Sequence, residues 1–280
     1  VSGKACSAAL RGKNFQVIEL DAGRDVVQRL SELRPDVVFN ALHGRWGEDG
    51  SIQGLLEWLR IPYTHSGVMA SALAMDKQRS KHIFSNSGLP TAPGFMIDKS
   101  GLLTSHPLEK PYVVKPINEG SSIGVYFVNP KEDPPLKVAS DMPSILMVEE
   151  YIPGRELTVT VMGKKALAVT DIITQNWYDY DAKYKKGGSI HEVPAKIPEI
   201  IQEKCLEYAL SAHELIGCRG ISRADFRWDE SLGLDGLILL EINTQPGMTP
   251  TSLVPEQAQI CGIEFDDLCH WLVEDASCDR

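Results

Sequence analysis

The sequence predicts a mixed α/β and α+β fold, in which a doubly wound parallel α/β domain is followed by antiparallel sheets. Helical and buried-strand patterns alternate over residues 1–59, which is typical of a parallel sheet with crossover helices. From Tyr112 onward the pattern changes to short strands separated by glycine turns, which favours antiparallel pairing. With 280 residues, of which 43% are hydrophobic, the chain can bury two or three packed units. We predict domains over 1–75, 76–155 and 156–280.

The N-terminal domain is expected to alternate helices with buried strands. Its first helix reads as a crossover, and a crossover in a parallel sheet follows a strand. No strand pattern precedes this helix, so we expect the first strand of the sheet to be missing. The expected helices are 1–11, 25–33 and 51–59, and the expected strands are 15–20 and 37–42.

The remaining elements build the antiparallel part of the fold. An apolar stripe over 198–216 predicts a helix that Gly217 ends in the left-handed conformation. The last two strands follow each other closely enough to form a hairpin. Segment 178–188 is polar, aromatic and Lys-rich without clear periodicity, and we interpret it as a candidate lid. The expected strands are 112–115, 124–128, 145–152, 156–162, 220–228 and 236–243.

Composition excludes several classes of protein. A net charge of −10 and a pI near 5.2 argue against nucleic-acid binding, which needs clustered Lys and Arg. No run of the roughly 18 apolar residues that a membrane span requires is present, so no membrane partner is expected. The six cysteines show no C-x-x-C spacing, which indicates reduced thiols and a cytoplasmic location.

The strongest chemical signal lies in the two last strands. The two-residue period of a strand gathers polar side chains on one face of each. The hairpin then brings Asp225, Glu241 and Asn243 together as oxygen ligands, which suit Mg²⁺. The alternative is a solvated charged face. The expected shared faces are Arg223, Asp225 and Arg227 on the first strand, and Leu237, Leu239, Glu241 and Asn243 on the second.

Two further clusters are candidates for nucleotide contacts. Lys115 ends an apolar strand and precedes the glycine-containing segment 118–124, whose backbone N–H groups can approach an anion closely. Lys77 supplies another cation. An ordinary β-turn and a solvated lysine are the alternatives. At 149–152 a strand ends in Glu-Glu-Tyr-Ile, where backbone groups can meet an adenine edge, with Glu156 just beyond.

Taken together, these residues resemble the ATP-grasp set of D-alanine–D-alanine ligases, and the resemblance runs nearly end to end. Two matches are specific to that family rather than to ATP-grasp enzymes in general: residues 41–45 with 47–50, and residues 178–180 with 182–184. The other matching residues are Lys77 in Met-Asp-Lys, Lys115 in Val-Lys-Pro, 119–122, 149–152 with Glu156, 223–225, 241–244 and 246–249.

The resemblance implies an ATP-grasp fold and assigns a role to each matching residue. It implies ATP and two Mg²⁺ or Mn²⁺ ions as cofactors. Lys77 and Lys115 would contact the phosphates, and Glu149 and Glu156 would contact adenine and ribose. Ser121 and Tyr184 would belong to one hydrogen-bonded network. Arg223 and the Gly247 N–H would stabilise an oxyanion. The implied ATP-binding residues are Lys77, Lys115, Glu149, Tyr151, Ile152, Glu156 and Lys183; the metal ligands Asp225, Glu241 and Asn243; and the substrate contacts His43, Ser252 and Leu253.

The implied reaction joins two D-alanines through a D-alanyl phosphate for peptidoglycan synthesis, by a homodimer. Segment 178–188, with Lys183 and Tyr184, would be the lid that excludes water from the intermediate. The family opens with a glycine-rich turn whose glutamate binds the first substrate, and this turn is not found here. We therefore expect a shortened member in which ATP binding survives better than ligation.

Three alternatives remain open at this point. A D-alanine–D-lactate ligase would share the ATP site, although Tyr184 argues for an amine acceptor. A catalytically impaired ATP-binding protein fits the absent glutamate, although the metal set is intact. A simple periplasmic-type binding module would not need Asp225, Glu241 and Asn243 together.

Overall fold

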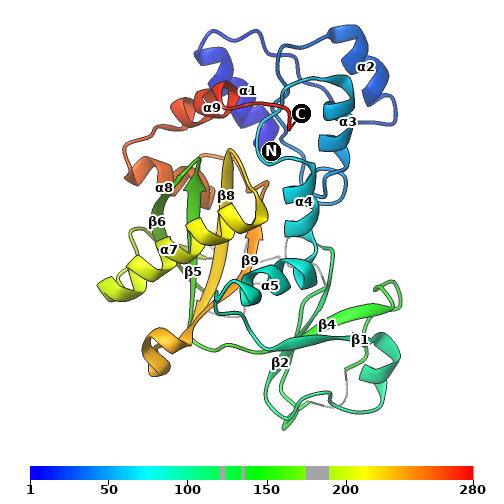
Figure 1. The fold of residues 1–280 in the computed structure, drawn as a ribbon, viewed down its shortest axis with the longest axis vertical. Coiled ribbons are helices and arrows are strands. Elements are labelled where there is room, and N and C mark those ends of the chain that lie inside the picture. Colours follow the sequence, from blue (N-terminus) through cyan, green and yellow to red (C-terminus); the bar gives the residue numbers. More distant parts are fainter. Residues whose placement is uncertain (120–123, 134–135, 175–188, 280) are drawn as a thin grey trace.

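The computed structural model describes residues 1–119, 124–133, 136–174 and 189–279. Within these residues there are two antiparallel sheets, with strand orders β1-β4-β2-β3 and β7-β6-β5-β8-β9 (Figure 1). The mixed fold class is confirmed. The helices are α1 (Ser2–Gly12), α2 (Val26–Leu33), α3 (Ser51–Leu59), α4 (Val68–Met75), α5 (Lys77–Asn86), α7 (Glu199–Ile216), α8 (Leu253–Ile260) and α9 (Phe265–Glu274), with 3-10 turns η1 (Lys99–Leu103) and η2 (Glu230–Gly236). The strands are β1 (Gly94–Asp98), β2 (Tyr112–Pro116), β3 (Tyr126–Val128), β4 (Ile145–Glu150), β5 (Arg155–Met162), β6 (Lys165–Ile173), β7 (Ile190–Glu192), β8 (Ile221–Trp228) and β9 (Leu237–Asn243).

The N-terminal region has the three expected helices, but the strands predicted over 15–20 and 37–42 were wrong. In this region the described residues show one parallel bridge, between Val38 and Tyr63, in which Val38 N donates to Pro62 O over 2.8 Å and Val38 O accepts from Thr64 N over 3.1 Å. An extended segment joins a sheet only where a neighbour supplies hydrogen bonds along its length. Residues 15–20 form no strand, and Phe15 and Val17 are partly buried against the core that contains the C-terminal helices.

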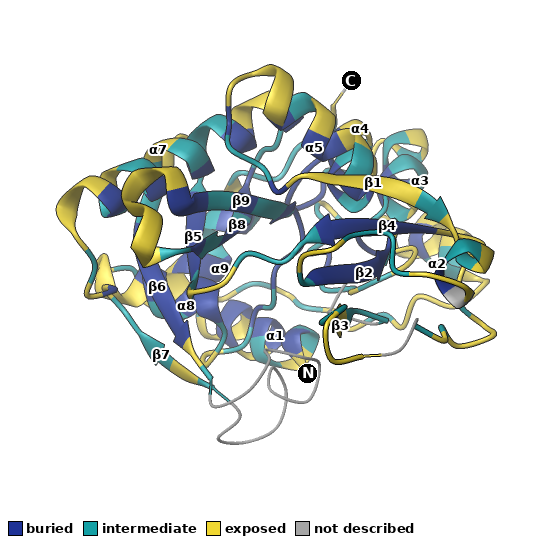
Figure 2. Ribbon diagram, turned by 90° about the horizontal axis from the view of Figure 1, so that it is seen from below, coloured by how far each residue is buried: buried dark blue, intermediate teal, exposed yellow. Residues whose placement is uncertain are grey.

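The smaller sheet forms its own core. Strand β2 is buried along its whole length between β4 and β3, whereas β1 lies exposed at the edge, a contrast that Figure 2 shows in dark blue and yellow. This sheet contains Lys115 and Glu149, which face each other across neighbouring strands. The core consists of Leu102, Tyr112, Val114, Val128, Leu146 and Val148.

The larger sheet separates a hydrophobic core from a polar face. Helix α7 covers one side with a buried stripe that includes Ile201, Cys205 and Ala209. It ends at Gly217, whose φ of 76° is left-handed as predicted. In the middle of β5 and β8 the side chains that point away from α7 are polar and include Thr158 and Asp225, whereas Met162 and Ile221 at the strand ends lie in a second hydrophobic core. The polar side chains of the sheet thus lie on the side opposite α7.

The beginning and the end of the chain share a third core. Helix α1 packs beside α9, with α8 close by (Figure 1). Cys6 and Leu10 of α1 lie in one buried cluster with Val254 of α8 and with Leu268 and Leu272 of α9. The division into domains 1–75, 76–155 and 156–280 stays a prediction. No helix among the described residues is long and apolar enough to cross a membrane.

The packing of α7 on the large sheet predicts an acid-sensitive contribution to stability from His213. This side chain is 3% exposed, and its Nδ1 lies 2.7 Å from the Ser222 hydroxyl on β8. Burial lowers its pKa from 6.5 to about 4. The unfolded chain therefore takes up a proton below about pH 6.5 that the folded protein does not bind until about pH 4. Acidification from pH 7 to pH 5 should lower the free energy of unfolding by about 2 kcal/mol at this site.

Urea unfolding of the His213→Gln variant at the two pH values measures this contribution. Between pH 7 and pH 5, the free energy of unfolding of the variant should fall by about 2 kcal/mol less than that of the unmodified protein. His82→Gln, at an exposed position of α5, is the matched control and should follow the unmodified protein. Parallel losses in all three proteins would exclude His213 as the source.

Candidate active site

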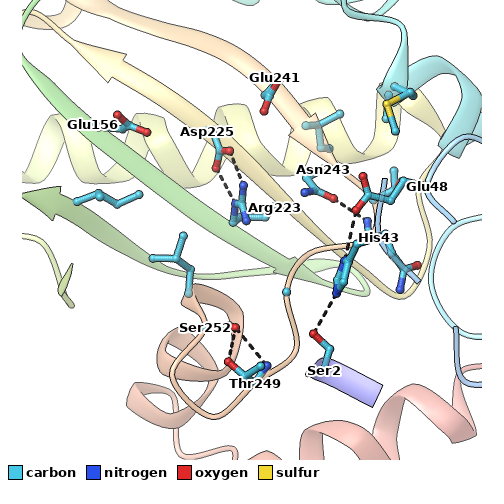
Figure 3. Close-up of a pocket in the computed structure, with 18 of the residues that line it drawn as sticks. Ser2, His43, Glu48, Glu156, Arg223, Asp225, Glu241, Asn243, Thr249 and Ser252 are labelled. Carbon is cyan, nitrogen blue, oxygen red and sulfur yellow. Dashed lines mark hydrogen bonds and ion pairs between the residues drawn. The ribbon is translucent and has the colours of Figure 1, made fainter. Parts of the chain in front are cut away.

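A pocket of about 590 Å³ lies between the polar face of the large sheet, the start of α5 and two loops (Figure 3). Strands β5, β6, β7, β8 and β9 supply its floor. The loop over 43–48 and the loop over 244–253 form its walls. Of the predicted site residues, the pocket contains His43, Lys77, Glu156, Arg223, Asp225, Glu241, Asn243, Gly247, Ser252 and Leu253.

The predicted metal ligands meet on β8 and β9. Asp225 lies directly opposite Glu241, and Arg223 lies directly opposite Asn243. A β-bulge follows, because Phe226 pairs with Leu239 rather than with Leu240. Asp225, Glu241 and Asn243 therefore lie close together on the two strands and line one pocket.

The bulge also corrects one detail of the predicted strand faces. Leu237 and Leu239 were expected on the same face as Glu241 and Asn243, but both leucines are 0% exposed in the α7 core. The additional residue in the strand reverses the alternation. Glu241 and Asn243 therefore reach the pocket while the leucines remain in the core.

Asp225 is held by two neighbours. Its Oδ1 accepts hydrogen bonds from Arg223 Nε (2.8 Å) and from the Thr158 hydroxyl (2.7 Å), and its Oδ2 accepts from Arg223 Nη2 (2.6 Å). Figure 3 shows the paired Arg223 contacts. Glu241 has a different counter-ion, since its Oε2 lies 3.2 Å from Lys77 Nζ. Each carboxylate of the metal set is thus paired with a cation from the predicted site.

Lys77 is placed by the start of helix α5. Asp76 caps this helix by accepting a hydrogen bond from Arg79 N over 3.0 Å, so Lys77 is its first residue. The ammonium donates to Glu119 O over 2.7 Å, within the predicted phosphate-binding segment 118–124. Lys77 therefore joins the metal ligands to that segment.

The donor set of Asp225, Glu241 and Asn243 fits a divalent cation. Among the described residues, no group of three or more His, Cys, Asp and Glu side chains is positioned to hold a metal by itself. Two carboxylates and one amide suit a hard ion such as Mg²⁺, which is usually bound through one or two carboxylates, waters and substrate phosphates. The site therefore fits a metal that is completed by a phosphate ligand.

Lys115 on β2 and Glu149 on β4, both predicted as nucleotide contacts, form an ion pair between neighbouring strands of the small sheet. Glu149 is 4% exposed and also pairs with Lys81, which the sequence analysis did not single out. Lys81 Nζ donates to Ala92 O over 2.6 Å as well. Burial opposes the charged form of Glu149, but the two lysines lower the pKa of its carboxyl overall. Burial lowers the pKa of Lys81. Lys81 lies four residues after Lys77 and therefore on the same side of a helix. This spacing is the sequence feature from which Lys81 could have been predicted as a site residue.

The other predicted nucleotide contacts are gathered around Arg227. Its guanidinium donates to Ile152 O (3.0 Å) and to the Tyr151 hydroxyl (3.1 Å), and lies 3.5 Å from Glu156 Oε2. The Tyr151 ring also meets Phe127 edge to face at 4.8 Å between centroids. Arg227 thus links the end of the small sheet to the first strand of the large one.

His43 lies at the opposite end of the pocket. Its Nε2 is 3.0 Å from the Ser2 hydroxyl, and its Nδ1 is 3.4 Å from Glu48 Oε1. Its loop is fixed by Asn40, which donates to Gly47 O over 3.0 Å and to the Gln245 side chain over 3.2 Å. The two loops that form the pocket walls are therefore tied together. Neither Asn40 nor Gln245 was predicted, because a buried amide has no sequence signature of its own.

Gly247, Ser252 and Leu253 form one corner at the start of α8. Ser252 precedes the helix, and its hydroxyl accepts from Thr249 N over 3.1 Å. A side chain at Gly247 would come within 3.2 Å of that hydroxyl, so the glycine permits the close approach. The first backbone N–H groups of a helix attract anions, which makes this corner suitable for a carboxylate.

His191 on β7 was also missed. It lines the pocket, with Nδ1 2.7 Å from Glu256 Oε2 of α8 and Nε2 3.1 Å from the Ser189 hydroxyl. These contacts tie α8 to the edge of the large sheet. The predicted residues Ser121, Lys183 and Tyr184, and the candidate lid, lie outside the described residues.

Comparisons with known proteins agree with this geometry. Residues 6–66 match the family described as D-ala D-ala ligase N-terminus, and residues 83–274 match D-ala D-ala ligase C-terminus. The chain is 64% identical over 280 residues to the D-alanine–D-alanine ligase of Ruegeria pomeroyi, covering 100% of this chain and 92% of that protein. For the enzyme of Cereibacter sphaeroides the identity is 63% over 279 residues, covering 100% and 91%.

A solved structure has the same fold. The crystal structure of D-alanine–D-alanine ligase from Bacillus anthracis complexed with ATP aligns with a TM-score of 0.77 and 26% identity, covering 98% of this chain and 90% of that one. Because both halves of the sequence, the fold and the full-length relatives agree, the chain belongs to the D-alanine–D-alanine ligase family.

Proposed function

We propose that this protein uses ATP to join two D-alanines through a D-alanyl phosphate, giving D-alanyl-D-alanine for peptidoglycan synthesis. The observation that carries the proposal is the pairing of Asp225 with Arg223 and of Glu241 with Lys77 inside one pocket. This arrangement supplies metal ligands and cations for a phosphoryl group at the same place. The relatives are named for D-alanine as both substrates, which supports this reaction over a D-lactate ligase or an inactive ATP-binding protein.

The phosphate end of the site is assigned to the charged pairs. Asp225, Glu241 and Asn243 would hold two Mg²⁺ or Mn²⁺ ions, which when bound offset negative charge on the phosphates. Lys77 is already 3.2 Å from Glu241, and it turns to phosphate oxygens when the carboxylate gains a stronger partner. Lys115 likewise turns from Glu149 to phosphate oxygens, and Glu149 keeps Lys81 as its counter-ion. The lysines therefore start from positions close to their catalytic partners.

The nucleoside end of the site is assigned to the strand ends around Arg227. Glu149 and Glu156 would contact adenine and ribose, with Tyr151 and the backbone of Ile152 beside the base. Arg227 holds three of these residues together, which supports their acting as one surface. We assign Lys183 to ATP and Ser121 and Tyr184 to the substrate network on the family resemblance alone.

The amino-acid end of the site is assigned to the two loops. The first D-alanine would lie beside His43, where its carboxylate would attack the γ-phosphoryl group of ATP and release ADP. The second would place its carboxylate at Ser252 and the N-terminus of α8, and its amine would attack the acyl phosphate, releasing inorganic phosphate and a proton. Arg223 and the Gly247 N–H would stabilise the oxyanion that forms. The pocket that joins these residues in one volume supports this path.

A homodimer in the cytoplasm is also proposed. All six cysteines are free thiols, which supports a reducing compartment. On the adjacent helices α3 and α4, Trp58 is 89% and Met69 72% exposed, and we take these two apolar side chains as the candidates for the contact between subunits. Sedimentation velocity should find a dimer, and Trp58→Glu should convert it to a monomer. A monomer before any substitution would exclude the dimer.

The Glu241→Gln substitution tests the metal site. Glutamine keeps the size of the side chain on a partly exposed strand face, so thermal melting should change little. Loss of one anionic ligand should lower kcat by about 100-fold or more. Phosphate release from ATP with D-alanine measures it. Glu207→Gln, on the exposed side of α7, is the matched control. Full activity of Glu241→Gln would remove this residue from the metal set.

The Lys81→Met substitution tests the buried ion cluster. Without Lys81, Lys115 would be the remaining counter-ion of a buried carboxylate, and its movement toward phosphate would leave an unpaired charge, which is costly. The dissociation constant for ATP should rise roughly 10-fold or more, measured by calorimetry, and Lys81→Arg should restore most of the affinity. Lys164→Met at an exposed turn should bind ATP normally. Normal ATP binding by Lys81→Met would contradict this role.

A further inference from the structure

Thr158 contacts the metal ligand Asp225 from the neighbouring strand. The two residues are directly opposite in the β5–β8 register. The Thr158 hydroxyl lies 2.7 Å from Asp225 Oδ1 and 3.2 Å from Ala224 O. It carries one proton, and the ionised carboxylate is the closer and stronger acceptor. The hydroxyl therefore donates to the carboxylate.

The position of this hydroxyl is fixed. Thr158 is 0% exposed in the middle of β5, and a β-branched side chain has few χ1 conformations available. Among the described residues, the side-chain partners of the Asp225 carboxylate are Thr158 on β5 and Arg223 on its own strand. The orientation of the carboxylate thus depends on one neutral donor and one cationic donor.

The two donors differ in how they respond to a bound cation. Arg223 carries a positive charge, so it repels a divalent ion at Asp225 and competes for the same lone pairs. Thr158 is neutral and binds only one lone pair of Oδ1, leaving the others available. When a cation is bound, Thr158 is the contact that can remain.

We propose that Thr158 is a positioning residue that holds the Asp225 carboxylate in the orientation needed for divalent-cation binding. This inference rests on the proposed function, because it takes Asp225 to be a metal ligand. Hydrogen-bond partners of metal ligands commonly contribute 10- to 100-fold to metal affinity. Thr158 should therefore act on the affinity for the cation rather than on the stability of the fold.

The same sheet offers matched controls. Thr160 lies two residues along β5, opposite Arg223, and Thr170 lies opposite Thr158 on β6. Both are 0% exposed, and within the described residues neither hydroxyl has a hydrogen-bond partner. A threonine can thus be buried at this face without a hydrogen bond from its hydroxyl. Replacing either by valine removes a hydroxyl from the same environment without touching Asp225.

The test is a titration with Mn²⁺ in the presence of a non-hydrolysable ATP analogue, followed by the electron paramagnetic resonance signal of the free ion. Thr158→Val should raise the Mn²⁺ dissociation constant by about 10- to 100-fold. Thr160→Val should bind as the unmodified protein does. Thr158→Ser keeps the hydroxyl and should retain most of the affinity. Circular dichroism melts of each variant establish that it is folded.

The reference variant Asp225→Asn separates the two proposals. If Asp225→Asn and the unmodified protein bind Mn²⁺ equally, or neither binds it, the metal site itself is misassigned and the role of Thr158 is lost with it. If Asp225→Asn loses Mn²⁺ while Thr158→Val keeps it, only the role of Thr158 is overturned. A Thr158→Ser variant that folds but binds as weakly as Thr158→Val would also overturn it, because the hydroxyl would not be the cause.

Discussion

The juxtaposition of Asp225 and Glu241 on paired strands is the constraint around which the rest of the site is arranged. Two carboxylates side by side repel each other unless positive charge is close to them. Arg223 and Lys77 provide that charge. Arg223 comes from the same strand as Asp225, whereas Lys77 comes from the start of α5. The ion pair between Lys77 and Glu241 therefore helps to hold the first turn of that helix over the sheet.

The same principle operates a second time at Glu149, but in a drier environment. The Asp225 and Glu241 side chains reach a pocket, whereas Glu149 is almost completely buried between Lys81 and Lys115. A buried ion that loses one partner is strongly destabilised. Two partners on different elements let one of them move while the charge stays compensated. Helix α5 supplies a lysine to each of these acidic centres, which makes it the structural link between them.

Local sequence patterns predicted the elements whose hydrogen bonds are local or whose partners follow closely. Helix α7 with its terminal Gly217 and the β8–β9 hairpin are examples. The strand expected over 15–20 was not formed, since a strand depends on a neighbour that its own pattern does not specify. The β-bulge beside Asp225 reversed the expected faces of Leu237 and Leu239, because a two-residue period cannot register an inserted residue. Thr158 and Lys81 depend on contacts from other elements, so their roles appear only in three dimensions.

The shared core of α1, α8 and α9 has a consequence for how the chain is made. The apolar side of α1, with Cys6 and Leu10, packs against residues such as Leu268 that are synthesised much later. Contacts between such distant segments slow folding, because a long loop must close before they form. Until ribosomal synthesis reaches α9, this side of α1 has no native cover, and uncovered apolar surface of this kind promotes association between nascent chains.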